Sequence, residues 1–153
     1  MTKVSDRLNR LAESATLAMA RMSRELQAKG IDVIALSLGE PDFDTPDFIK
    51  EAAKKAIDDN FSHYTPVPGL PELRSAIVQK FKRDNYLEFT PDQIVTSTGA
   101  KQSLANLCLS LLNPGDEVLL PCPYWVSYAE IVKLAEGVLV EVPSTIDTDF
   151  KVN

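Results

Sequence analysis

The chain has 153 residues, which is enough for one ordinary domain or for part of a larger one. Hydrophobic residues make up 44% of it and charged residues 25%, the balance of a soluble globular protein. The net charge of −6, with lysine and arginine scattered among acids, argues against a nucleic-acid-binding surface.

Features of membrane, secreted and metal-binding proteins are missing from the sequence. No apolar run approaches the length that crosses a bilayer, and the polar, charged residues 1–10 do not resemble a secretory signal. We therefore expect a cytoplasmic protein, in which Cys108 and Cys122 are reduced structural thiols. The single histidine, His63, has no cysteine or second histidine near it, so we expect no metal site.

The first elements expected are a helix and a short strand. Apolar residues recur at helical spacing over 17–26, with Ser14 as a candidate N-cap and Gly30 as the residue that ends the helix. Val33–Leu38 has the apolar pattern of a short strand, and a turn follows it.

Two more helices are expected before the pattern changes. Thr45 is a candidate cap with Pro46 at the first helical position, and apolar residues over 48–57 have helical spacing. Residues 60–71 form an irregular, proline-rich stretch, and Glu72–Asn85 has one apolar face typical of a helix.

From residue 94 onward, short strand-like runs alternate with helical runs. We predict strands at Ile94–Ser97, Glu117–Leu120 and Val138–Val142, and helices at Lys101–Leu112 and Tyr124–Ala135. This alternation indicates an α/β fold with a mostly parallel sheet. Because three such strands make only a thin sheet, the pattern is that of a domain cut in its middle; a small complete domain with a polar tail is the alternative.

Thr96–Lys101 lies between a predicted strand and a predicted helix. Such a junction presents backbone N–H groups and the positive end of the helix dipole, and Gly99 and Ala100 let a phosphate approach closely. The segment is neither a Walker A loop nor a G-x-G-x-x-G fingerprint. A glycine that serves only to reverse the chain is the alternative interpretation.

Three further segments are candidates for binding. Trp125 follows the carboxyl end of a strand, where α/β proteins bind ligands, and it can stack on a flat ring or pack a helix start into the core. Gly39 permits close approach by a ligand or simply forms a tight turn. Tyr64 lies in a proline-rich loop that presents its phenol or only connects two helices.

Taken together, these segments resemble one family, the class I pyridoxal-phosphate-dependent aminotransferases. Ser37–Pro46 is similar to the segment that contacts the substrate α-carboxylate, and His63–Arg74 to the Y-x-x-x-x-G-x-x-x-L-R segment. Thr96–Gln102 (TSTGAKQ) resembles the phosphate-binding turn, and Asn113–Tyr128 resembles the turn, strand and aromatic stacking residue. The resemblance covers residues 14–142 and is closest to the bacterial aspartate aminotransferases.

This resemblance implies a fold. It is the α/β fold of the type I pyridoxal-phosphate transferases, with a three-layer α/β/α large domain of which only the N-terminal part is present. Residues 1–43 are expected to form the N-terminal arm and part of the small domain. Residues 44–153 are expected to form the first part of the cofactor-binding large domain.

The resemblance also implies cofactor-binding residues. Gly99 shapes the turn, the N–H groups of Ala100 and Lys101 hold the phosphate of pyridoxal phosphate, and Trp125 stacks on its pyridine ring. Tyr64 reaches the phosphate of the neighbouring subunit, which makes the full-length protein a homodimer with shared active sites.

Substrate-binding residues are implied in the same way. Gly39 lies against the substrate α-carboxylate, Thr16 and Trp125 border the substrate, and Lys101 attracts the distal carboxylate of aspartate or glutamate. The implied reaction moves an amino group between L-aspartate, or a related amino acid, and a 2-oxo acid.

None of the lysines, Lys101 included, matches the residue that forms the Schiff base with the cofactor in this family. That lysine, with the remaining catalytic residues, follows in family order beyond Asn153. We therefore assign no catalytic residue, and we expect this chain to be inactive by itself and to expose apolar faces.

Other activities remain open at this point. Within the family they are an aromatic or prephenate aminotransferase and a C–S lyase of sulfur amino acids. Lys101 favours a dicarboxylic substrate, which includes prephenate, and Ala12 and Glu13 beside Thr16 bear on that choice. A non-enzymatic, cofactor-binding regulatory module is disfavoured because no helix-turn-helix precedes the domain. A nucleotide-binding domain is disfavoured because the glycine fingerprint is missing.

Overall fold

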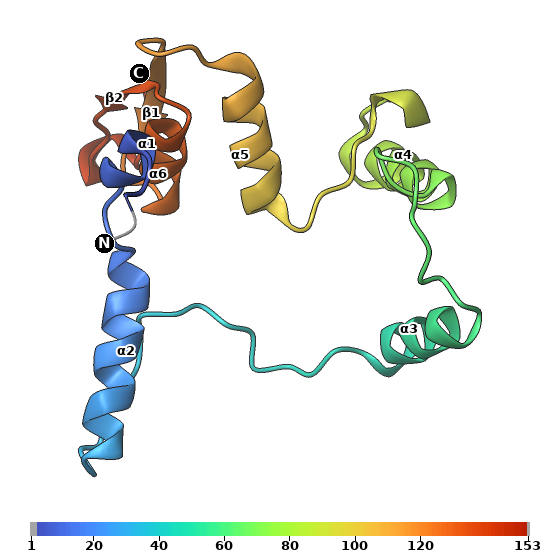
Figure 1. Cartoon of the computed structure of the whole chain (residues 1–153), viewed down its shortest axis with the longest axis horizontal. Coiled ribbons are helices and arrows are strands. Elements are labelled where there is room, and N and C mark those ends of the chain that lie inside the picture. The colour runs from blue at the N-terminus through green and yellow to red at the C-terminus, as the bar shows by residue number, and fades with distance from the viewer. Residues whose placement is uncertain (1–2, 153) are drawn as a thin grey trace. The chain divides into compact units, whose positions relative to one another are not determined.

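The computed structural model describes residues 3–152, which divide into two compact units. One is built from residues up to Gly39 and from Lys101 onward, and the other is Glu40–Ala100. The elements of the first unit are α1 (Asp6–Asn9), α2 (Ala15–Ala28), α5 (Ala100–Leu111), β1 (Glu117–Pro121), α6 (Ser127–Leu134), β2 (Val138–Val142) and the 3-10 turn η2 (Ile146–Thr148). Figure 1 shows α1, α6, β1 and β2 gathered in one cluster.

The centre of that cluster is a parallel β-α-β unit. β1 pairs with β2 in a register that runs from Glu117 opposite Val138 to Pro121 opposite Val142. α6 connects the two strands and packs on β2, and it carries most of the buried side chains of the unit. These buried residues are Ala129, Ile131, Val132 and, just past the helix, Ala135. The predicted parallel pairing and both of these predicted strands are therefore confirmed.

Helix α5 covers this unit incompletely. An apolar cavity of about 250 Å³ remains between Leu104 and Cys108 of α5 and side chains of β1 and α6. Leu107 and Leu111, also on α5, are exposed. Both cysteines, Cys108 and Cys122, are free thiols, and burial raises the pKa of Cys122, with Glu141 adding to the effect.

Helix α2 follows its predicted ends, whereas the strand predicted after it does not form. The side chain of Ser14 accepts a hydrogen bond from the Leu17 N–H at 3.4 Å, and Gly30 ends the helix at a φ of +80°. Residues 33–38 have no strand pairing, and Ile34 and Leu36 are 84% and 90% exposed. The prediction was wrong because a strand requires a hydrogen-bonded neighbour, which the described residues do not supply here.

The second unit holds α3 (Asp47–Asp58), α4 (Pro71–Asn85) and the 3-10 turn η1 (Pro91–Gln93). The prediction that Thr45 caps α3 and Pro46 is its first residue was wrong. Pro46 has an extended ψ of 141° and is itself the N-cap, so the helix begins one residue later. Pro71 does occupy the first helical position of α4, as proline prefers.

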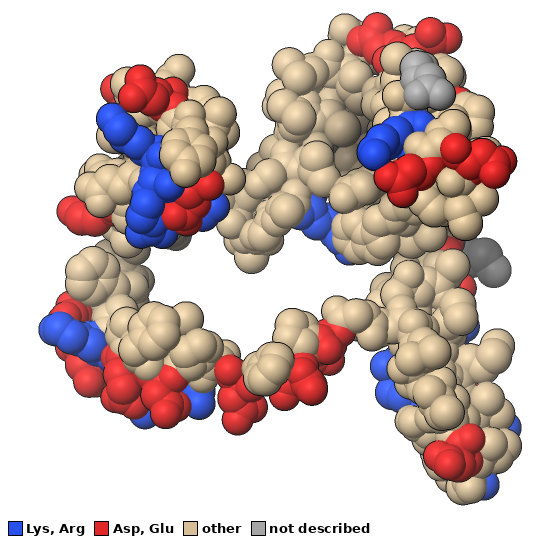
Figure 2. All heavy atoms as spheres, turned by 180° about the vertical axis from the view of Figure 1, so that it is seen from behind, with Lys and Arg blue, Asp and Glu red and all other residues tan. Residues whose placement is uncertain are grey.

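The exposed surface of α3 carries ion pairs between residues three positions apart. Lys50 pairs with Asp47 at 3.1 Å, and Lys54 pairs with Glu51 at 2.7 Å. Figure 2 shows acidic and basic side chains close together at the lower left, where α3 lies. Exposed pairs of this kind contribute only about 0.3–0.5 kcal/mol each. Phe48, on the same helix, stays exposed, as expected for a chain that leaves apolar faces uncovered.

Arg74 ties α4 to the segment that leads toward residue 99. Its Nε donates to the carbonyl of Pro91 at 2.8 Å and to that of Ile94 at 3.0 Å, and its guanidinium pairs with Asp92 at 3.2 Å. The Arg74 side chain is only 13% exposed, and Ile94 is buried. These contacts fix the backbone without a strand ladder.

The strand predicted at Ile94–Ser97 is absent for the same reason as the one at 33–38. The Thr96 N–H donates to the Pro68 carbonyl at 2.9 Å, and no strand of the described residues lies beside the segment. Gly69, next to Pro68, is buried at a φ of +107°, with the Thr96 side chain directly against it. The irregular stretch predicted over 60–71 thus packs on the segment before the predicted phosphate turn.

Candidate functional site

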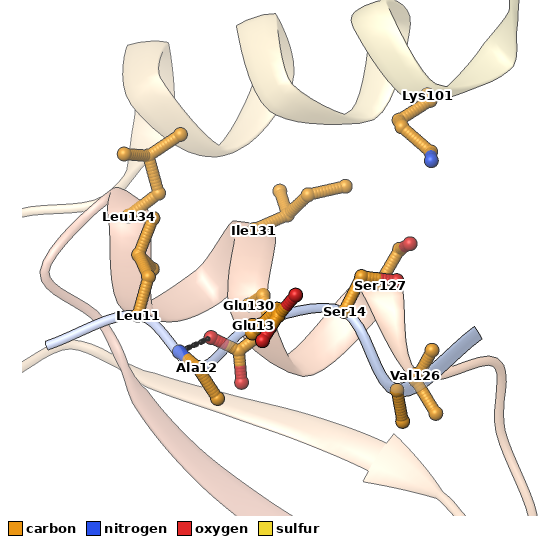
Figure 3. Close-up of a pocket in the computed structure, with 11 residues that line it drawn as sticks. Leu11, Ala12, Glu13, Ser14, Lys101, Val126, Ser127, Glu130, Ile131 and Leu134 are labelled. Carbon is orange, nitrogen blue, oxygen red and sulfur yellow. Dashed lines mark hydrogen bonds between the residues drawn. The ribbon is translucent and has the colours of Figure 1, made fainter. Parts of the chain in front are cut away.

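A cavity of about 350 Å³ opens in the first unit between three pieces of chain. Its walls are residues 11–15, Lys101 at the start of α5, and one side of α6 with the residue before it. Figure 3 shows Lys101 reaching from α5 toward Ser14 and Ser127 on the opposite walls. The wall thus combines the ammonium of Lys101, two hydroxyls and the carboxylates of Glu13 and Glu130 with apolar side chains, among them Leu11, Ile131 and Leu134.

The indole of Trp125 lies directly beside this cavity, in contact with Lys101. The Lys101 Nζ is 4.4 Å from the centroid of the Trp125 ring, within the range of a cation–π interaction. Tyr128 packs on the same indole edge to face, with ring centroids 5.6 Å apart. Trp125 is 45% exposed, so it is not buried in a core in this chain.

The contact between Lys101 and Trp125 is weak enough to be exchanged. A cation–π interaction at an exposed site contributes about 0.5–1 kcal/mol. A carboxylate in the cavity can pair with the same ammonium through a charge-assisted hydrogen bond, which is about twice as strong as a neutral one. An acidic ligand in the cavity would therefore compete with the indole for the Lys101 ammonium.

The turn before α5 has the backbone conformation that its glycine permits. Gly99 has a φ of +87°, and its N–H donates to the Ser97 carbonyl at 2.8 Å. A Cβ added at Gly99 would meet no atom within 4 Å, so the requirement for glycine is one of backbone conformation. Ala100 is the first residue of α5, and the leading N–H groups of a helix have no partner inside it.

Thr16 and Gly39, the other predicted site residues of the first unit, do not line this cavity. Thr16 is half-buried in the first turn of α2, next to the wall residue Ala15. Gly39 is exposed with open space beside its Cα. Tyr64, in the second unit, is fully exposed. The structure therefore brings together Lys101, Trp125 and the segment before Thr16, and it leaves Gly39 and Tyr64 as exposed residues.

Helix α6 begins later than predicted, at Ser127, because the residues before it are held in another way. The Tyr124 hydroxyl donates to Glu141 of β2 at 2.5 Å, and the Trp125 carbonyl accepts the Tyr128 N–H in a turn. Sequence reasoning missed the role of Tyr124, because the contact depends on the register of β1 against β2. The hydrogen bond fixes the residue that precedes Trp125.

The hydrogen bond to Glu141, followed by burial, raises the pKa of Tyr124 to about 12. A group whose pKa is raised on folding contributes stability that is present below its ordinary pKa of 10 and is lost between pH 10 and about 12. The tyrosinate absorbance of the wild type and of Tyr124→Phe is measured as a function of pH, and the difference between the two curves reports Tyr124. We expect this difference to titrate near pH 12. In Glu141→Gln the titration of the Tyr124 component should move toward pH 10. A Tyr124 component that already titrates near pH 10 in the wild type would contradict the contact.

The part of the chain that the structure describes shows neither a metal-binding cluster nor a membrane-spanning helix. Among residues 3–152, no group of three or more histidine, cysteine or acidic side chains is placed to hold a metal ion. None of the described helices is both long and apolar enough to cross a membrane.

Comparison with known proteins decides the family. The family described as aminotransferase class I and II matches residues 31–153. The chain belongs to this family. Within it, the chain is 53% identical over 151 residues to the aspartate/prephenate aminotransferase of Cereibacter sphaeroides. This match covers 99% of the chain and 38% of the relative. The chain is 48% identical over 149 residues to the aspartate aminotransferase of Bacillus sp. strain YM-2, covering 97% of the chain and 38% of the relative.

Solved aminotransferase structures have the same fold. The aspartate aminotransferase from Thermus thermophilus with maleate superposes with a TM-score of 0.95 at 44% sequence identity. That match covers 100% of this chain and 40% of the other. The chain therefore has the fold of the type I pyridoxal-phosphate transferases, as its resemblance predicted, and it spans about 38% of the length of the curated relatives it matches.

Proposed function

We propose that the full-length protein is a pyridoxal-phosphate-dependent aminotransferase that moves an amino group between L-aspartate and a 2-oxo acid. The observation that carries the proposal is the contact of Lys101 with Trp125 at 4.4 Å beside a cavity of about 350 Å³. This contact puts the ammonium of Lys101, which would pair with a second carboxylate of the substrate, next to the half-exposed ring of Trp125. The names of the relatives in Cereibacter sphaeroides and Bacillus support the same activity.

The residues of this chain fit the cofactor. The open turn at Gly99 leads into the first N–H groups of α5, at Ala100 and Lys101, which would hold the phosphate. The exposed indole of Trp125 would stack on the pyridine ring. When bound, pyridoxal phosphate supplies a ring that accepts electrons from the substrate α-carbon.

The substrate would be held by other residues. The Lys101 ammonium would attract the distal carboxylate, Gly39 would lie against the α-carboxylate, and Thr16 would border the site. Such positioning fixes which bond at the α-carbon is aligned for reaction. None of these residues is the lysine that forms the covalent link with the cofactor, so this chain contributes binding and orientation.

The wider organisation is part of the same proposal. Residues 1–43 would belong to the N-terminal arm and small domain, and residues 44–153 to the start of the cofactor-binding large domain. The exposed phenol of Tyr64 would reach the phosphate of a neighbouring subunit, which makes the enzyme a homodimer. We place the enzyme in the cytoplasm.

Prephenate is the second substrate that an observation favours, because the Cereibacter sphaeroides relative is named for both activities. Prephenate is also a diacid, so the same Lys101 ammonium would serve it. A C–S lyase would act on a sulfur amino acid. A sulfur amino acid without a distal carboxylate would leave the Lys101 cation without a partner, whereas cystathionine carries a distal carboxylate and is distinguished by the reaction itself.

Half-reactions of the full-length protein test the proposal. The protein loaded with pyridoxal phosphate is mixed separately with aspartate, phenylalanine and cystathionine, and the absorbance of the bound cofactor is followed. We expect aspartate to convert the aldehyde form fully to the amine form and cystathionine to release no thiol. Conversion by phenylalanine with none by aspartate would overturn the aspartate assignment.

A further inference from the structure

The segment between α1 and α2 is attached to α6 by one carboxylate. Oε2 of Glu130 accepts the backbone N–H of Ala12 at 2.9 Å (Figure 3). Oε1 of the same carboxylate accepts a hydrogen bond from Lys133 at 2.7 Å. The Glu130 side chain is only 27% exposed. Hydrogen bonds from Lys133 and then from the Ala12 N–H lower its pKa, so it carries its charge at neutral pH.

This attachment lies where it sets the wall of the cavity. Ala12 leads within two residues to Ser14, whose side chain caps α2. Residues 12–15 form the wall that faces Lys101. On the other side, Glu130 is carried by α6, whose buried Ala129 and Ile131 hold it in the core of the unit. Glu130 therefore links a packed helix to a segment that has little packing of its own.

A negative charge beside a cavity for dicarboxylates would by itself weaken their binding. At Glu130 both oxygens are already occupied by donors, Lys133 and the Ala12 amide, so the charge is compensated locally. The arrangement suits an anchor for the backbone and does not suit a direct ligand of an acidic substrate.

A separate attachment holds α1 and offers a matched control. Arg7 and Arg10 both pair with Glu136, at 3.2 and 3.1 Å, just beyond the end of α6. None of these three residues lines the cavity. Removing Glu136 should loosen α1 and leave the Ala12 amide attached to Glu130.

We propose that Glu130 is a positioning residue for substrate recognition: by accepting the Ala12 N–H it fixes residues 12–15 opposite Lys101 and so favours dicarboxylic over neutral substrates. The inference rests on the proposed function for its substrate class. The attachment itself does not depend on that function, so the two can fail separately.

The experiment compares Glu130→Ala, Glu130→Gln and Glu136→Ala in the full-length enzyme. Hydrogen exchange of a peptide over 11–16 should become faster in Glu130→Ala and stay close to wild type in the other two, because glutamine keeps an acceptor oxygen. The Kd of maleate, a dicarboxylate that cannot react, is measured by calorimetry and should rise about tenfold in Glu130→Ala, as expected for loss of a hydrogen bond to a charged group. The KM of aspartate should rise by a similar factor, with a smaller change in kcat.

Four results would overturn the inference. Unchanged exchange over 11–16 in Glu130→Ala would show that no anchor exists. Faster exchange in Glu130→Ala with an unchanged Kd of maleate would show that the contact is merely structural. An equal rise of the Kd of maleate in Glu136→Ala would show the same. A glutamine variant as impaired as the alanine variant would show that charge, and not the acceptor, matters. If the wild-type enzyme fails to react with aspartate, the proposed function is wrong. The hydrogen exchange over 11–16 and the Kd of maleate still decide the role of Glu130.

Discussion

Replacing Lys101 by glutamate should raise the KM of the full-length enzyme for aspartate by about a hundredfold or more. The change turns an attraction for the distal carboxylate into a repulsion. Two charges about 4 Å apart near a protein surface interact by up to about 4 kcal/mol, and a hundredfold loss requires only about 2.7 kcal/mol. Phenylalanine has no distal charge, so its KM should change by no more than a few-fold.

Two further variants make the Lys101 experiment specific. Lys101→Met removes the charge but keeps an unbranched apolar side chain beside Trp125, and it should lose about tenfold for aspartate. Lys151→Glu makes the same charge reversal at an exposed residue outside the cavity wall and should have little effect. If Lys101→Glu weakened aspartate and phenylalanine equally, Lys101 would not be the residue that recognises the second carboxylate.

Replacing Gly69 by alanine should destabilise the second unit by about 3 kcal/mol or more. The added Cβ would lie 2.1 Å from Oγ1 of Thr96, at a φ of +107° that disfavours any side chain. Thr96 cannot easily move aside, because its N–H and its hydroxyl both donate to the Pro68 carbonyl, at 2.9 and 3.2 Å. The measurement is the hydrogen-exchange protection of the Thr96 amide, together with the Tm of the full-length protein.

The Gly69 prediction has a close control in Gly30. Gly30 also has a positive φ, +80°, but a Cβ added there meets no atom within 4 Å. Gly30→Ala should therefore cost only the backbone strain, about 1 kcal/mol. Adding Thr96→Ala to Gly69→Ala should recover part of the loss, since it removes the clashing atoms. Equal effects of Gly69→Ala and Gly30→Ala would show that the contact with Thr96 is unimportant.

The elements that the sequence predicted well are those set by local signals. Helix α2 follows from its apolar spacing, its Ser14 cap and Gly30, and the parallel pair β1–β2 follows from the strand–helix–strand alternation. The strands at 33–38 and 94–97 failed because strand formation depends on a neighbour elsewhere, which apolar runs alone do not reveal.

The candidate site shows the same division between local and distant information. Lys101 and Trp125 were predicted by resemblance to a family, and the structure places them in contact. The contacts of Tyr124 with Glu141 and of Glu130 with Ala12 were not predicted, because each joins residues far apart in the chain. A pattern of residue types along one sequence holds no signal for such pairs.

The register of β1 against β2 has a consequence for the order of folding. Residues that pair across the two strands, such as Glu117 and Val138, are only 21 positions apart (138 − 117), and α6 lies within the interval. Closing so short a loop costs little chain entropy, so this unit can form before contacts of greater sequence separation. In pulse-labelled refolding, the amides of 117–121 and 138–142 should be among the earliest to resist exchange, which would make this unit a nucleus on which later segments assemble.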